Sequence, residues 1–196
     1  MITWPERNRR LAHRTAIVRA LRPRIDRDEA VEAFTRGLGG AMRRVALGPV
    51  RSVADVYVPF HLFRVAVARP AGDERMVLGI DAVTATLDLY RFDDPPQSRD
   101  VIHVHTRNHV TATVSPTAAH DAIVARLRRI IYQRAGFFAG GRCHLDVRAI
   151  DDEISVPYWV GFFGRRDEAS IVVMDGVRRQ IEGGKMRRLI ASWLAE

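Results

Sequence analysis

The chain has 196 residues, enough for one large domain or two small ones, and a net charge of +8 at pH 7. It contains no run of about eighteen apolar residues, which excludes a membrane-spanning helix. Cys143 is the single cysteine, which excludes an internal disulfide and a zinc cage made of cysteines. We therefore expect a soluble protein of a reducing, cytoplasmic compartment.

Positive charge concentrates at the start of the chain. Residues 1–24 hold seven arginines against Glu6, and no continuous apolar segment follows them as it would in a secretory signal. Thr3, Pro5 and Glu6 are typical of a helix start, so we expect a basic helical arm over 1–24, helical to about Leu21. The arm supplies four candidate contacts for an anion or a partner: Arg7, Arg9, Arg10 and Arg14.

A second helix is predicted to begin at Asp26 and Glu29. Apolar residues then recur at spacings of three and four, on one face that we expect to pack against a sheet. These residues are Val31, Phe34, Leu38, Met42 and Val45. Three glycines over 37–40 predict either close approach of another backbone or a break in the helix.

Short β-branched and aromatic runs over 50–57, 60–68, 76–80 and 86–90 predict an antiparallel meander. The polar, proline-bearing segment 94–100 reads as a linker between domains.

An extended run over 101–114 follows the linker, and Ser115 and Pro116 predict the start of a further helix. Strands over 143–149, 156–163 and 169–174 and a closing helix over 185–194 complete the second half.

The two halves share residues in the same order. Val58, Pro59 and Phe60 match Val156, Pro157 and Tyr158, and Asp81 with Val83 matches Asp175 with Val177. We therefore predict an α+β fold of two tandem helix-plus-antiparallel-hairpin-sheet units, over 25–93 and 101–196, with an N-terminal and a C-terminal helix.

The segment Gly79-Ile80-Asp81-Ala82-Val83-Thr84 resembles the Asp-x-x-Thr-Gly stretch of the PepSY and cystatin-like small domains, with Ala85 where glycine is usual. The resemblance extends over 28–33, 62–67 and 77–90. It implies a helix packed across an antiparallel hairpin sheet, and a role of the kind proposed for that group, the modulation of peptidases.

Three functional hypotheses follow. The leading one is a non-catalytic protein-binding or regulatory module without cofactor or membrane partner, which forms a homodimer through the uncapped strand edge at 101–114. A second is a metal-dependent enzyme that uses His103, His105 and His109, because alternation on a strand places the first two imidazoles on one face. A third is an anion or nucleic-acid binder that uses the N-terminal arginines.

Overall fold

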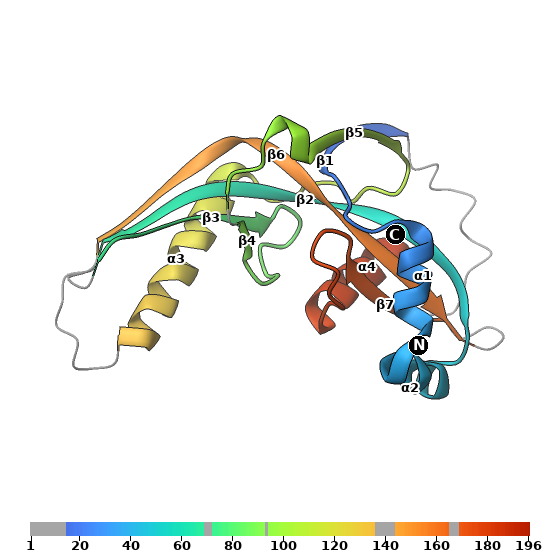
Figure 1. Cartoon of the computed structure of the whole chain (residues 1–196). Helices are drawn as coiled ribbons and strands as arrows, with labels where there is room; N and C mark the ends of the chain where they lie inside the picture. The colour runs from blue at the N-terminus through green and yellow to red at the C-terminus, as the bar shows by residue number, and fades with distance from the viewer. Residues whose placement is uncertain (1–14, 69–71, 93, 136–143, 165–168) are drawn as a thin grey trace. The chain divides into compact units, whose positions relative to one another are not determined.

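The computed structural model describes residues 15–68, 72–92, 94–135, 144–164 and 169–196 (Figure 1). It has both helices and a mixed sheet, which confirms the α+β class. The elements follow one another as β1 (Ala16–Leu21), α1 (Arg27–Thr35), α2 (Gly37–Leu47), β2 (Val50–Ala68), β3 (Glu74–Asp81), β4 (Tyr90–Phe92), the short 3₁₀ helix η1 (Ser98–Asp100), β5 (Val101–Thr106), α3 (Pro116–Ala135), β6 (His144–Phe163), β7 (Ser170–Asp175) and α4 (Gly184–Ala195).

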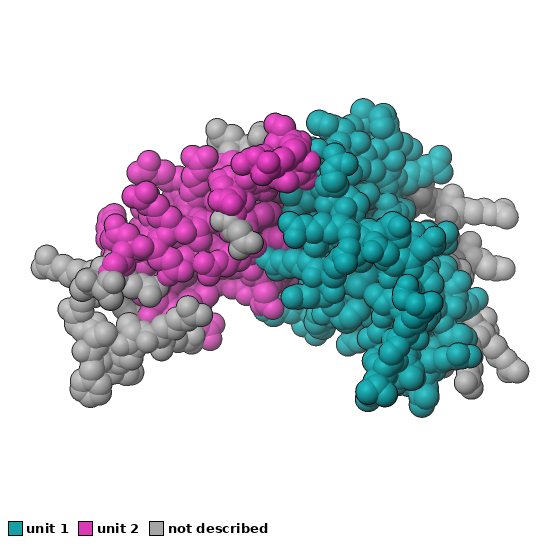
Figure 2. Space-filling model, in the orientation of Figure 1, with its two compact units in different colours: residues 1–58, 101–110, 155–196 teal, residues 59–100, 111–154 magenta. Residues whose placement is uncertain are grey.

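The strands are hydrogen-bonded in the order β4-β3-β2-β6-β1-β5, and β7 also pairs with β6. The chain divides into two compact units, here called unit 1 (residues 1–58, 101–110 and 155–196) and unit 2 (residues 59–100 and 111–154), drawn in teal and magenta in Figure 2. Each unit combines residues from both halves of the chain. The compact units therefore differ from the sequential division at 94–100 that the linker predicted.

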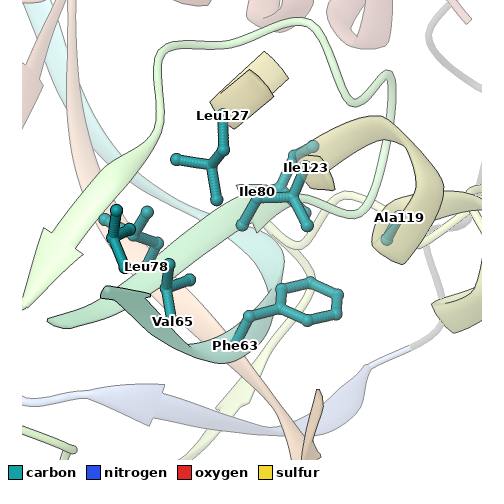
Figure 3. Close-up of a cluster of buried hydrophobic side chains, with 8 residues drawn as sticks. Phe63, Val65, Leu78, Ile80, Ala119, Ile123 and Leu127 are labelled. Carbon is teal, nitrogen blue, oxygen red and sulfur yellow. The ribbon is translucent and has the colours of Figure 1, made fainter. Parts of the chain in front are cut away.

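Unit 2 is built around α3, which packs on the β2–β3 hairpin. Figure 3 shows the helix side chains lying together with those of the hairpin. The buried core consists of Phe63, Val65 and Val67 of β2, Leu78 and Ile80 of β3, and Ala119, Ile123 and Leu127 of α3. A helix from the second half of the chain thus covers a hairpin from the first half.

Unit 1 has the reciprocal arrangement. Phe34 of α1 is fully buried and meets Phe163 of β6 edge-on, with ring centroids 6.1 Å apart. Val172 and Met174 of β7 complete this side of the core, together with Ile25, Ala30 and Val53. Here a helix from the first half covers a hairpin from the second half.

The two hairpins have the same register. Phe60 pairs with Asp81 in the first, and Tyr158 pairs with Asp175 in the second. After each aspartate the chain turns in the same way, and the fourth residue after it adopts a left-handed conformation without being glycine: Ala85 at φ 56° and Arg179 at φ 62°. The Ala85 position is the one at which glycine was expected.

The segment before each covering helix is hydrogen-bonded to the aspartate turn of the hairpin that the helix covers. The Thr113 and Val114 amides donate to Ala82 O at 2.8 and 2.9 Å in unit 2. In unit 1 the Arg24 amide donates to Gly176 O at 2.8 Å. Backbone hydrogen bonds therefore fix where each helix begins relative to the hairpin beneath it.

The predicted helix over the first 21 residues is wrong for Ala16–Leu21, which form β1. This segment pairs antiparallel with β5, from Ala16 opposite Thr106 to Leu21 opposite Val101. Its β-branched Ile17 and Val18 suit a strand, and a long-range partner outweighs local helix propensity. Residues 1–14, with Arg7, Arg9, Arg10 and Arg14, lie outside the described residues.

Two predicted strand breaks are also absent. The runs 50–57 and 60–68 form the single strand β2, and the runs predicted at 143–149 and 156–163 join in β6. Pro59 lies inside β2, where its carbonyl accepts from the Ala82 amide at 2.8 Å. Pro157 has the same place in β6, accepting from the Gly176 amide at 2.9 Å.

Candidate interaction surface

β5 carries two of the three candidate histidines. His103 and His105 are exposed, and their partners on β1 are Arg19 and Ile17. Residues directly opposite in an antiparallel pair share a face, so these four side chains lie on one exposed face of the β1–β5 pair. The prediction that the two imidazoles share a face is confirmed.

His109 lies beyond the end of β5 and therefore apart from His103 and His105. It forms a parallel bridge with Tyr57 of β2, and its Nδ1 is buried without a hydrogen-bond partner among the described residues. Within the described ranges, no group of three or more His, Cys, Asp or Glu side chains is close enough to hold a metal ion. Cys143 lies outside those ranges.

A small polar cluster secures the segment after β5 to β2. The Tyr57 amide donates to Asn108 O at 2.8 Å, the Val110 amide donates to Tyr57 O at 2.9 Å, and Asn108 Nδ2 lies 3.4 Å from Asp55 Oδ1. Burial, the negative charge of Asp55 and its hydrogen bond raise the pKa of Tyr57 to about 12. The phenol is therefore protonated at neutral pH and acts as a structural donor in unit 1.

β5 ends the sheet on its side of unit 1. It pairs with β1 and with no other strand that the structure describes. Its six residues, Val101–Thr106, include neither proline nor a permanently charged side chain. Proline and charged side chains commonly protect an edge strand from pairing with another chain, and β5 lacks both.

α2 exposes an apolar stripe, defined by Leu38, Met42 and Val45. Their exposed fractions are 86%, 72% and 87%. The prediction that these residues share a buried face with Val31 and Phe34 is wrong. Gly37 has φ 68°, so the chain turns between α1 and α2, and the apolar face of α2 points away from the core that Phe34 enters.

The sequence contained a signal for this outcome in its glycines. A Cβ on Gly40 would lie 2.3 Å from the backbone of Thr35, so α2 packs against the end of α1 through its glycine side. Close approach and a helix break, stated as alternatives for the glycines, both occur.

Asp81 and Asp175 are both fully buried, and both bind their own turns. Asp81 Oδ1 accepts from the Thr84 amide at 2.6 Å, and Asp175 Oδ1 accepts from the Val177 amide at 2.7 Å. Each carboxylate thus accepts hydrogen bonds from the backbone amides of its own turn, as an aspartate in a turn commonly does.

A scan against protein-family models matches none of them, and searches among curated proteins and solved structures find no similar chain. No helix in the described part of the chain is long and apolar enough to cross a membrane.

Proposed function

We propose that this chain is a non-catalytic protein-binding module that self-associates by adding a second copy of β5 to the outer edge of its own β5. One observation carries the proposal: β5 is a terminal strand without proline, lysine, arginine or carboxylate side chains. Unpaired backbone N–H and C=O groups along such an edge form a template for another strand. A twofold pairing satisfies both edges at once.

The proposal includes an origin by tandem duplication. The shared register of the two hairpins, the equivalent aspartate turns and the matching left-handed residues support it. The exchange of α1 and α3 between hairpins is the arrangement expected if two copies of one unit once paired as a domain-swapped dimer. The PepSY and cystatin-like resemblance and the modulation of peptidases that it implies stay predictions.

A pair of proline substitutions tests the edge. Neighbouring residues on a strand direct their N–H groups to opposite sides, so one of His103→Pro and Val104→Pro removes a donor to β1 and the other removes a donor at the outer edge. We expect the outer substitution to be the milder one in thermal unfolding and to convert a dimer to a monomer in sedimentation at micromolar concentration.

Hydrogen exchange of the unmodified chain tests the same pairing without a substitution that could misfold the protein. Amides of residues 101–106 should exchange more slowly at high than at low protein concentration, while buried amides of β2 should not change. A chain that sediments as a monomer, or a dimer that survives both proline substitutions, would contradict the proposal.

A further inference from the structure

The surface of α2 differs in composition from an ordinary solvated helix. Its eleven residues are GLGGAMRRVAL, so Arg43 and Arg44 are the two polar side chains and no residue is acidic. Leu38, Met42 and Val45, the apolar stripe, stand almost fully in solvent. Helices on protein surfaces normally place charged and polar groups on that face.

The fold orients the stripe outward. Gly40 is buried against α1 and Leu47 packs on the core of unit 1, and both lie about half a turn from the stripe at 100° per residue. Arg43 fixes this orientation, because its Nη2 donates to Ala33 O at 2.8 Å. The stripe therefore points away from the protein for as long as the α1–α2 junction is intact.

The charges beside the stripe are positive. Arg44 is exposed and Arg43 is partly exposed, and at 100° per residue each lies about 130° around the helix from the centre of the stripe, one on either side of it. Arg36, at the start of α2, forms an ion pair with Glu32 of α1, so the two α2 arginines supply the uncompensated charge. The other acidic side chains of the neighbouring helix, Asp28 and Glu29, lie in its first turn.

The geometry points to a peripheral membrane-docking site: α2 lies in the headgroup region of an anionic lipid surface, with Leu38, Met42 and Val45 inserted and the exposed Arg44 against lipid phosphates. A short helix with an apolar face flanked by arginine is the type of segment that binds in the plane of the interface. This inference rests on α2 and is independent of the proposed pairing through β5.

A second copy of the chain fits this helix less well. α2 has two arginines and no acidic residue, so a second α2 offers no opposite charge to pair with them. A stable protein interface also buries about 800 Å² per partner over 20–30 residues, with about ten hydrogen bonds. α2 offers three large side chains and two cations, which suffice for a lipid surface because that surface adapts to the helix.

Each end of α2 is marked by a glycine with a positive φ. Gly37 at φ 68° precedes the first turn, and Gly48 at φ 90° follows the last. Side chains other than glycine rarely adopt such backbone angles, so these two positions join a separately oriented helix to α1 and to β2.

Vesicle sedimentation tests the inference with the full chain. We expect binding to vesicles of 30% phosphatidylserine in phosphatidylcholine, at least tenfold weaker binding to pure phosphatidylcholine, and weakening at high salt. Combining Leu38→Gln, Met42→Gln and Val45→Gln should reduce binding at least tenfold, whereas the matched exposed substitution Ile17→Gln should not. Both variants should keep the melting temperature, since each site is solvated.

A fluorescence readout locates the contact. In a Cys143→Ser background, an environment-sensitive dye on Met42→Cys should shift to the blue on adding anionic vesicles, and the same dye on Ile17→Cys should not. Absence of vesicle binding, or binding that survives the triple glutamine variant, would overturn the inference. So would a triple variant that changes from dimer to monomer without lipid, because a second copy would then cover the stripe.

Discussion

Asp81 and Asp175 occupy equivalent turns, but their carboxylates have different numbers of partners. Asp81 Oδ1 accepts from the amides of Thr84 and Ala85, and its Oδ2 accepts from the Leu87 amide at 2.9 Å. Asp175 Oδ1 accepts from the amides of Val177 and Arg178, and its buried Oδ2 has no hydrogen-bond partner among the described residues. The two turns therefore depend differently on the second oxygen.

We predict that Asp81→Asn destabilises the protein by about 1–3 kcal/mol more than Asp175→Asn. An asparagine at 81 can keep Oδ1 in place, but its amide group then faces the Leu87 N–H, and two buried donors meet. At 175 the amide replaces an oxygen that accepts no described bond. Urea unfolding of both variants at pH 7 measures the difference, and equal losses would show that Oδ2 of Asp81 contributes nothing.

Among the elements, the α1–α2 junction depends on one close contact. Gly40 approaches the Thr35 backbone so closely that a Cβ would lie 2.3 Å from it, while a Cβ on Gly39 would meet the Arg43 side chain at an ordinary 3.5 Å. The two glycines are adjacent in one helix. They therefore separate the effect of packing from that of helix propensity.

We expect Gly40→Ala to cost about 1–3 kcal/mol through overpacking. Gly39→Ala should instead be neutral or stabilising by up to about 1 kcal/mol, because alanine is the better helix former. Thermal unfolding of the two variants provides the comparison. If both substitutions stabilise the protein, α2 does not pack against α1 through its glycine side.

Local patterns predicted the elements that carry their own start signals. Asp26 and Glu29 form a capping box, with the Glu29 amide donating to Asp26 Oδ1 at 2.8 Å, and α3 begins at Pro116 as Ser115 indicated. The closing helix and β7 also lie where their patterns placed them. Capping residues act over a single turn, which is why the sequence reports them directly.

Long-range partners decided the remaining assignments. β1 is a strand because β5 pairs with it, and no pattern within residues 16–21 identifies that partner. The spacing of Phe34, Leu38 and Met42 suggested one helix face, but the backbone angle of Gly37 divides it between two helices. The contact edge was predicted as a strand over 101–114, but β5 ends at Thr106. The α2 stripe was assigned to the core.

For the whole molecule, the order of elements along the chain does not reveal that α1 and α3 each cover the hairpin of the other half. Matching residues indicated two similar halves, and adjacency along the chain suggested that each helix covers its own hairpin. The structure shows α1 on β6–β7 and α3 on β2–β3. Both cores therefore contain residues from both sides of the linker at 94–100.

This exchange predicts how the protein responds to a cut in its linker. A protease site inserted between Pro96 and Gln97 would divide the chain without touching either core. Phe34, Phe63, Ile80 and Ile123 are each fully buried, so separating the fragments would expose the apolar surface of both cores.

We expect the two fragments to remain together on gel filtration after cleavage and to separate only in denaturant. The melting temperature of the cut protein should fall and become dependent on concentration, because unfolding now releases two chains. Fragments that separate in native buffer and each keep a cooperative thermal transition would show instead that every helix covers the hairpin of its own half.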